Sequence, residues 1–258
     1  MVQLHNESSP QPELAYLGPE GTYSHQAAYE LCGDSVRYEP RSSIRDLGVS
    51  ITDPNRTARF AFIPLENSTF GSVVETYDIL RHPALGKTAF IRGEQILSVR
   101  HCLIALPGTK IEDITSVSSH EQALGQCTEY VRRVLPNATK VPVTSTAFAA
   151  KSLLEHADDV VYNRAAISAA ICAKLYGLVI LEEGIQDGEA NQTRFLLFHD
   201  SADEPLPLDI RPPLQYRSLL RIQLDDICKP HPAGSYLILP SPRPCQDCFG
   251  PSSHDNAN

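Results

Sequence analysis

The sequence predicts an α/β fold for residues 14–200 of this 258-residue chain. Two observations support the prediction. Short apolar runs alternate with amphipathic stretches throughout the region, as strands and helices do when they follow one another. Several of the apolar runs also end at a turn rich in glycine or hydroxyl residues, and such turns commonly lead into a helix. The length is sufficient for one large domain or for two smaller lobes with a core each.

Each predicted element follows from a local signal. A helix is expected at 24–32, where Gly33 stops it. Val141–Val143 precedes a second entry from strand to helix, at Ser145. Short apolar runs predict strands, which are 14–17, 59–63, 96–99, 102–106, 178–181 and 195–198.

Two further helices are predicted from capping and periodicity. Ser119 and Gln122 form an S-x-x-Q capping box, which opens a helix that ends before Pro136. The apolar face of that helix is Leu124, Cys127, Val131 and Val134. A later helix is closed by Gly177. Its apolar face is Ile167, Ile171 and Leu175.

The two ends of the chain differ from this region. Residues 1–13 are polar and contain proline, so we expect them to be disordered. Residues 201–258 hold half of the prolines, and clear periodicity occurs only at 216–222. From about residue 229 the composition is typical of a poorly ordered tail.

Composition excludes several classes of partner. The formal net charge of −9 argues against a surface that neutralises nucleic-acid phosphates. No apolar run approaches the roughly 18–20 residues of a membrane span. The N-terminus has neither the basic segment nor the apolar segment of a secretory signal. We therefore expect a cytoplasmic protein with reduced thiols, no nucleic-acid partner and no membrane contact.

Three turns that open predicted helices carry hydroxyl side chains. Helix N-termini expose free N–H groups and the positive end of the helix dipole, so each can hold a carboxylate. Serine and threonine are also the usual N-cap residues, so ordinary capping remains an alternative. Three such turns in an open α/β sheet, whose strand ends face one crevice, make a site for a small anion equally plausible. The hydroxyl residues are Thr22, Ser24, Ser119, Ser145 and Thr146.

A fourth candidate is the polar segment that follows the predicted strand 59–63. It places the Glu66 carboxylate, the Asn67 amide and the Ser68 hydroxyl in succession. A polar loop would account for it equally well. The sequence contains no G-x-S-x-G, H-E-x-x-H, P-loop or G-x-G-x-x-G motif, so no nucleophilic triad, zinc protease or nucleotide site is predicted.

One set of residues has the spacing of a zinc site. The pairs C-x-x-H and C-x-x-C match a tetrahedral ligand set. They lie in the proline-rich, aperiodic part of the chain, however, and we predict no metal there. The residues are Cys228, His231, Cys245 and Cys248.

Ordered motifs across residues 14–198 resemble the prephenate dehydratase family. The motifs are GPEGTYS at 18–24, IPLENS at 63–68 with GSV at 71–73, SHEQALGQC at 119–127, STA at 145–147, LYG at 175–177 and NQTRF at 191–195. Each motif alone is weak, but all of them in this order is a specific signal. One departure is Glu121, where the family usually has proline. Glutamate suits a first helical turn, so we expect no loss of function there.

The resemblance implies a two-lobed fold like that of type 2 periplasmic binding proteins, with the active site in the cleft between the lobes. The first lobe would comprise about 14–95 and 190–200, and the second about 96–185. Family members commonly carry a C-terminal ACT domain that binds phenylalanine. Here 216–222 resembles its first strand, and we expect 201–258 to be a vestigial or truncated form with little feedback inhibition. The family is commonly dimeric or tetrameric, so a homodimer is one expected assembly, and the sequence leaves the oligomeric state open.

The resemblance also implies a reaction, in which prephenate becomes phenylpyruvate, carbon dioxide and water without a cofactor. Thr193 of the T-R-F motif would be catalytic, either as a donor to the departing oxygen or by passing a proton from Glu66. Asn67 and Gln126 would hold the substrate or its ring hydroxyl. Arg194 is expected away from the carboxylate that leaves, because a salt bridge would stabilise the ground state. The full expected set is Thr193, Asn67 and Glu66 as catalytic residues, with Thr22, Ser24, Ser68, Ser119, Gln126, Ser145, Thr146, Arg194 and Phe195 as substrate-binding residues.

Two alternatives stay open at this point. An arogenate dehydratase would perform the same chemistry on the aminated substrate, and sequence separates the two poorly. A non-catalytic module that binds small acids could use the same two-lobed fold, although retention of Thr193 and Asn67 argues against it.

Overall fold

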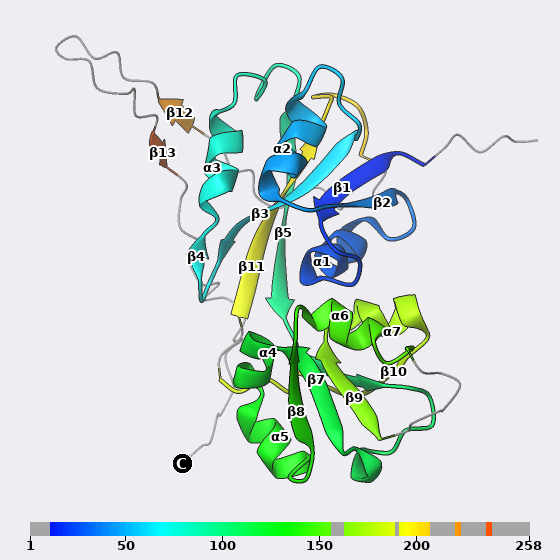
Figure 1. Cartoon of the computed structure of the whole chain (residues 1–258). Coiled ribbons are helices and arrows are strands. Elements are labelled where there is room, and N and C mark those ends of the chain that lie inside the picture. Colours follow the sequence, from blue (N-terminus) through cyan, green and yellow to red (C-terminus); the bar gives the residue numbers. More distant parts are fainter. Residues whose placement is uncertain (1–10, 156–162, 189–190, 207–219, 223–235, 239–258) are drawn as a thin grey trace, which may run out of the picture. The chain divides into compact units, whose positions relative to one another are not determined.

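The computed structural model describes residues 11–155, 163–188, 191–206, 220–222 and 236–238. The chain divides into two compact units, Met1–Pro212 and Pro213–Asn258. The first unit contains two larger sheets with helices packed on them (Figure 1). In the second unit, two antiparallel strands are described. They are β12 (Leu220–Ile222) and β13 (Tyr236–Ile238).

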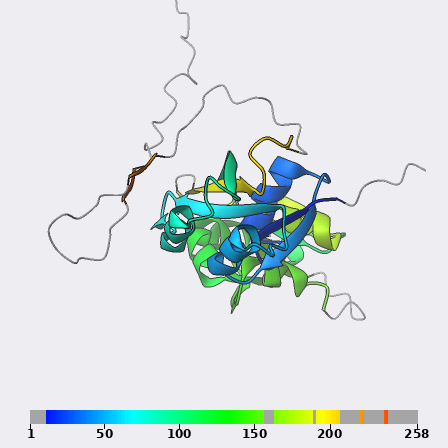
Figure 2. The same cartoon turned by 90° about the horizontal axis from the view of Figure 1, so that it is seen from above.

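The first sheet has the strand order β2-β1-β3-β11-β5, with the short β4 added to β3. β1, β2 and β3 run parallel, whereas β11 is antiparallel to both of its neighbours. The yellow β11 runs beside the cyan β3 in both views (Figures 1 and 2). The strands are β1 (Glu13–Leu17), β2 (Arg37–Arg41), β3 (Phe60–Asn67), β4 (Gly71–Ser72), β5 (Phe90–Val99) and β11 (Asn191–His199).

Three helices accompany this sheet, α1 (Tyr23–Cys32), α2 (Ile44–Thr52) and α3 (Val74–Arg81). Thr22 caps α1, because its Oγ1 accepts the His25 N–H at 3.4 Å. Gly33 ends the helix as predicted, in a backbone conformation with φ of 53°. The buried alanines of α1 pack against β1 and β3 in one apolar cluster, which fixes α1 on the sheet.

The second sheet has the order β10-β6-β9-β7-β8. Its strands are β6 (Cys102–Ala105), β7 (Ser116–His120), β8 (Thr139–Val143), β9 (Arg164–Ser168) and β10 (Val179–Glu183). Its helices are α4 (Glu121–Gln126), α5 (Thr128–Val134), α6 (Thr146–Lys151) and α7 (Ile171–Tyr176), and a short 3-10 turn spans Ile111–Asp113.

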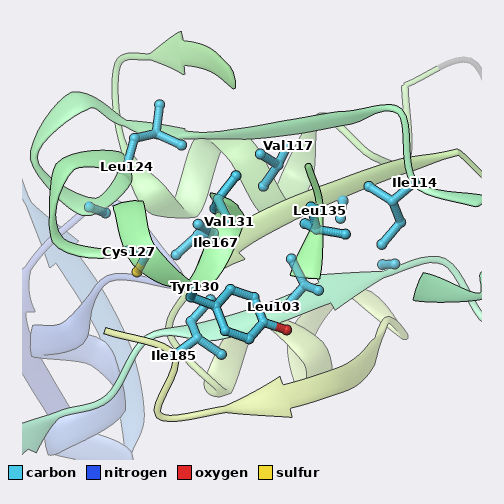
Figure 3. Packing of buried hydrophobic residues seen from close by; sticks show 13 residues of the cluster. Leu103, Ile114, Val117, Leu124, Cys127, Tyr130, Val131, Leu135, Ile167 and Ile185 are labelled. Atoms are coloured by element: carbon cyan, nitrogen blue, oxygen red, sulfur yellow. The ribbon is translucent and has the colours of Figure 1, made fainter. Parts of the chain in front are cut away.

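Helices cover both faces of the second sheet. Leu103 and Ile167 point to the face on which α4 and α5 pack, together with Cys127 and Val131 (Figure 3). Their neighbours on the same strands point to the opposite face and pack against α6 and α7. The alternation follows from the two-residue period of a strand, and it explains why these strands are apolar on both faces.

Two predictions about the second sheet are wrong. Ser119 does not cap a helix but lies near the end of β7, where its hydroxyl donates to the carbonyl of Ile167 at 2.6 Å. Ile167 is in turn a residue of β9 and not of a helix face. Both segments are buried by pairing with neighbouring strands, and that tertiary pairing outweighs the local capping and spacing signals.

The predicted helix after Ser119 is also divided in two at Cys127. The cause is a residue far along the chain. The backbone N–H of Asp187 donates to the Gln126 carbonyl, and the Asp187 carboxylate accepts the N–H of Glu129 at 2.8 Å. The Thr128 hydroxyl donates to the Gly125 carbonyl at 2.9 Å. These bonds replace the helical ladder at the break.

The strand predicted at 59–63 continues to Asn67, so Glu66 and Asn67 of the polar segment lie within β3, and Ser68 follows in a turn. Pro64 is tolerated there because the pairing with β11 shifts at this point. Phe195 faces Pro64 and Arg194 faces Glu66, which leaves Leu65 as an extra residue, a β-bulge. The bulge sets the register that brings the last residues of β3 opposite the first residues of β11.

The chain passes between the two sheets twice. It leaves the first sheet after Val99 and returns at Asn191, which is paired directly opposite Val99. The expected lobe boundary near residue 95 falls inside β5, which stays in the first sheet because it pairs with β11 over its full length. At the N-terminus, the first strand begins at Glu13 within the segment expected to be disordered. Glu13 forms ion pairs with Arg37 and Arg41 of the neighbouring strand.

Some expectations fall on residues that the structure does not describe. These are most of the N-terminal segment, the first part of 216–222, and the four residues with zinc-like spacing. Within the described ranges, no helix combines the length and the apolar character that a membrane span requires.

His25 provides a test of the packing of α1. Burial lowers its pKa from 6.5 to about 4, so the unfolded chain takes up this proton at a higher pH than the folded protein does. The free energy of unfolding should therefore fall as the pH drops from 6.5 towards 4, by at most about 3 kcal/mol from this residue. Urea unfolding at several pH values measures the effect. His25→Phe should reduce the slope, and an equal slope in both proteins would contradict the assignment.

Candidate active site

A pocket of about 280 Å³ is lined by residues of both sheets and their helices. The first lobe contributes Tyr23, Asn67, Phe70, Val99, Asn191 and Thr193. The connection after β5 contributes His101, and the second lobe contributes His120, Gln122, Ala123, Gln126, Ser145 and Thr146. Among these described residues there is no Asp, Glu, Lys or Arg. The pocket therefore presents amide, hydroxyl and imidazole groups beside apolar side chains, but no carboxylate, ammonium or guanidinium group.

Asn67 and Thr193 form the central pair of the pocket. They face each other across β3 and β11, and the Asn67 Nδ2 donates to Thr193 Oγ1 at 2.9 Å. The same Nδ2 donates to Asn191 Oδ1 at 2.6 Å. The Asn67 Oδ1 accepts the backbone N–H groups of Thr69 and Phe70, both at 2.9 Å. Because backbone N–H groups can only donate, they fix which end of the amide is oxygen.

This arrangement sets the direction of the Thr193 hydroxyl. Its oxygen accepts a hydrogen bond from Asn67, so its own hydrogen is left to donate elsewhere. Thr193 is half-buried and lines the pocket, whereas Arg194 and Phe195 after it are buried. A β-branched side chain on a strand has few rotamers, so the hydroxyl is held in one position. Thr193 can therefore donate a hydrogen bond to an acceptor in the pocket.

A second chain of hydrogen bonds crosses between the lobes. The Tyr23 hydroxyl lies 2.5 Å from His101 Nδ1, and His101 Nε2 lies 2.7 Å from Gln126 Oε1. Burial lowers the pKa of His101, although its hydrogen bond to Gln126 acts in the opposite direction. The ring is therefore neutral at pH 7, with one nitrogen that donates and one that accepts.

The second lobe presents the start of a helix to the pocket. Ser145 caps α6, and its Oγ accepts the Phe148 N–H at 2.9 Å. Thr146 is the first residue of the helix, and both residues line the pocket. The remaining N–H groups of the first turn have no partner within the helix, so this edge offers donors to an anionic group.

Glu66 and Arg194 lie next to the central pair in sequence but outside the pocket lining. Successive side chains on a strand point to opposite faces, so these two turn away from Asn67 and Thr193. Arg194 is 6% exposed and donates to Glu66 at 3.1 Å and to Glu94 at 2.9 Å. Its guanidinium joins β11 to both neighbouring strands. The geometry gives Glu66 a structural partner and no direct path to the pocket.

The other predicted residues also lie outside the lining, each for a structural reason. Thr22 is occupied as the cap of α1, and its hydroxyl donates to the Leu17 carbonyl at 3.0 Å. Ser68 accepts the Gln192 N–H at 2.9 Å, which closes the end of β3 on β11. Ser24 and Ser119 are buried. Phe195 stacks on Phe62 in the core, with ring centroids 4.8 Å apart.

Several lining residues were not predicted. Tyr23, His120, Gln122 and Asn191 all lie within the motifs quoted from the sequence, so inspecting every polar residue of those motifs would have found them. His101 gives no such signal. Its partners are 78 and 25 residues away, and only the folded chain brings them together.

A larger pocket of about 560 Å³ lies elsewhere, beside α1 and α7. Tyr16, His25, Tyr29 and Tyr38 form aromatic walls, with Lys174 at one side. It contains none of the predicted site residues. We take the smaller pocket as the candidate active site because it holds the Asn67–Thr193 pair and draws donors from both lobes. In the part of the chain that the structure describes, no three His, Cys, Asp or Glu side chains are grouped to hold a metal ion.

Two α/β lobes joined by two connections, with a pocket lined from both, define a fold of the type 2 periplasmic-binding-protein class. The family model described as prephenate dehydratase matches residues 14–203. The chain belongs to the prephenate dehydratase family, which confirms the resemblance seen in its motifs.

Individual relatives agree with this assignment. A bifunctional chorismate mutase/prephenate dehydratase of Neisseria gonorrhoeae is 39% identical over 184 residues, which cover 71% of this chain and 48% of that protein. Arogenate dehydratase 3, chloroplastic, of Arabidopsis thaliana is 38% identical over 196 residues, or 75% of this chain and 42% of that protein. The chain thus spans about half the length of these curated relatives or less. A crystal structure of prephenate dehydratase from Arthrobacter aurescens superimposes with a TM-score of 0.59 at 33% identity, covering 75% of this chain and 62% of that chain.

Proposed function

We propose that this chain is a lyase that converts prephenate to phenylpyruvate, carbon dioxide and water in phenylalanine biosynthesis. The prephenate dianion takes up one proton in this reaction. The electrons of the bond to the departing carboxylate move into the ring, while the bond to the ring oxygen breaks and the oxygen leaves as water. The ring becomes aromatic, so the driving force is internal, and neither a metal nor an organic cofactor is required.

The hydrogen bond from Asn67 to Thr193 carries the proposal. Hydroxide is a poor leaving group and needs a donor on the departing oxygen. Asn67 occupies the acceptor side of the Thr193 hydroxyl and leaves its hydrogen for that oxygen. We propose Thr193 as the catalytic donor and Asn67 as the residue that orients it. Threonine is too weak an acid to ionise, so its fixed geometry must compensate for its acidity.

The uncharged lining supports the same reaction. A cation on the carboxylate that leaves would stabilise the ground state and oppose decarboxylation. The Arg194 guanidinium, which follows Thr193 in sequence, is paired with Glu66 and Glu94 instead. We propose that the N–H groups and hydroxyls at Ser145 and Thr146 and the amide of Gln126 hold the pyruvyl carboxylate. Such neutral donors provide orientation without strong charge pairing.

The test is formation of phenylpyruvate from prephenate at neutral pH, read by ultraviolet absorbance after addition of alkali. Neutral pH is used because acid alone converts prephenate to phenylpyruvate without an enzyme. The purified chain should give steady turnover, and Thr193→Ala should give far less. Binding of prephenate without turnover would contradict the proposal and favour a non-catalytic module that binds small acids.

Arogenate is the second candidate substrate, because relatives in the same range of identity are named arogenate dehydratases. Arogenate carries an ammonium group where prephenate has a keto oxygen. Among the described lining residues there is no carboxylate to receive that ammonium. We therefore expect kcat/KM to be higher for prephenate. The reverse order would change the substrate assignment but leave the dehydratase chemistry in place.

We also propose a cytoplasmic location and a homodimeric assembly. The location is supported by the described cysteines, which are free and buried, as is usual in a reducing compartment. They are Cys32, Cys102, Cys127 and Cys172. The homodimer rests on the family resemblance, and sedimentation equilibrium measures it directly.

A further inference from the structure

His101 stands at the junction of the two lobes. It lies directly before β6, in the first connection between the sheets. Its backbone carbonyl accepts the N–H groups of Gly184 at 2.9 Å and Ile185 at 3.1 Å, which belong to the second connection. Its backbone N–H donates to Gln186 Oε1 at 3.0 Å. The residue is 4% exposed, so its backbone and ring are both held in place.

The ring of His101 joins one pocket residue from each lobe. Tyr23 belongs to α1 of the first lobe, and Gln126 ends α4 of the second. Both side chains line the pocket, and in the described structure each is hydrogen-bonded to the imidazole. Which nitrogen of the ring carries the hydrogen therefore decides whether Tyr23 and Gln126 act as donor or acceptor in these bonds, and so which groups they leave for a ligand.

A neutral imidazole allows two arrangements. In one, Tyr23 donates to Nδ1, and Nε2–H donates to the Gln126 oxygen. In the other, every bond is reversed, and Gln126 presents its oxygen to the pocket. In the structure it is the amide oxygen of Gln126 that faces Nε2, at 2.7 Å. An amide oxygen can only accept, so Nε2 carries the hydrogen and Nδ1 accepts from the Tyr23 hydroxyl, which is the first arrangement.

We infer that His101 is a positioning residue that turns the amide NH₂ of Gln126 towards the substrate, and that Tyr23 in turn fixes the tautomer of His101. The inference rests on the proposed function of the pocket for the identity of the substrate. In this arrangement the Gln126 oxygen is occupied by His101, and both amide hydrogens are left for a carboxylate. Tyr23 acts on the pocket through His101, since its only hydroxyl hydrogen is directed at the ring.

The kinetic test compares His101→Phe, Tyr23→Phe and the double variant. His101→Phe keeps an aromatic ring but removes both nitrogens, so the Gln126 amide is no longer fixed. A carboxylate that is present in both the substrate and the transition state should lose binding equally in both. KM for prephenate should rise about tenfold while kcat changes little. Tyr23→Phe should raise KM by about twofold or threefold, and the double variant should match His101→Phe, because the two residues act as one unit.

The control is His199→Phe, which makes the same substitution at another buried histidine. His199 lies at the far end of β11 and is 1% exposed, and it is absent from the pocket lining. Its KM and kcat should equal those of the wild type. If the KM effects of Tyr23→Phe and His101→Phe multiply in the double variant, Tyr23 contacts the substrate independently, and the inference is overturned.

A second readout does not depend on the substrate. Nitrogen-15 NMR of the imidazole distinguishes the two tautomers in the free protein. We expect the Nε2–H form of His101 at pH 7. The Nδ1–H form or a charged ring would overturn the inference even in an active enzyme. If instead the wild-type chain fails to turn over prephenate but shows the Nε2–H form, the proposed function fails and the arrangement at His101 stands.

Discussion

Replacing Thr193 with alanine should lower kcat for prephenate by about 100-fold or more, which is within the usual contribution of a positioned proton donor. The substitution removes the one hydroxyl in the pocket whose oxygen already accepts a bond from Asn67. KM should change little, because the departing oxygen needs its proton chiefly in the transition state. Initial rates over a range of prephenate concentrations separate the two constants.

Thr193→Ser is the matched variant. It keeps the hydroxyl but frees its rotamer, so it should recover a good part of the lost rate. The melting temperature of both variants should move by only a few degrees, because a half-buried pocket hydroxyl contributes little to stability. A structural role predicts the reverse. Thr193→Ala would then lower the melting temperature markedly and leave kcat per folded molecule intact.

Replacing Arg194 with methionine should have the largest effect on stability. The guanidinium is 6% exposed and bonds to carboxylates on both neighbouring strands. Removing one member of a buried ion pair commonly costs 3–5 kcal/mol. Because the side chains of Glu66 and Glu94 are 32% and 24% exposed, we expect a smaller loss of about 2–3 kcal/mol in the free energy of unfolding. Urea denaturation measures this loss.

The kinetic result for Arg194→Met distinguishes this role from substrate binding. Arg194 is outside the pocket lining, so kcat and KM per folded molecule should stay near the wild-type values. Glu66→Gln is the companion variant, since it keeps the shape of the side chain and removes its charge. It should cost less stability than Arg194→Met and should also leave the rate nearly intact. A collapse of kcat with an unchanged melting temperature would instead place either residue in the chemistry.

The elements that could be predicted from the sequence are those whose burial shows as a run of apolar residues. The runs FAFI at 60–63 and FLLF at 195–198 are apolar throughout, because both strands are interior strands of the first sheet. By contrast, β2 has the sequence RYEPR and was not predicted. It pairs on one side only and is joined to β1 by ion pairs of Glu13, so no apolar run marks it. Strand β9, RAAIS, consists largely of small residues that suit a helix equally well.

The site residues could likewise be predicted only where a local motif marks them. The motifs identified Asn67, Gln126, Ser145, Thr146 and Thr193, all of which line the pocket. The strand predicted at 195–198 begins at Asn191 in the structure. With that longer strand, the alternation of side chains places Thr193 and Arg194 on opposite faces. The bulge at Leu65, which brings Asn67 opposite Thr193, depends on the pairing of two distant strands and has no local signature. His101 likewise becomes part of the site only through contacts between the lobes.

The pairing of Asn191 opposite Val99 has a consequence for how the pocket would close around a ligand. The two connections between the sheets leave from adjacent strands, so any rotation of one lobe against the other has its axis close to them. Thr193 lies two residues beyond that axis, on the same sheet as Asn67. Parts near an axis are displaced least, whereas the start of α6 at Ser145 belongs to the lobe that would rotate. The Asn67–Thr193 pair, which we propose as the proton donor and its orienting residue, is therefore set when the chain folds, and a rotation of the lobes would move chiefly the groups of the second lobe.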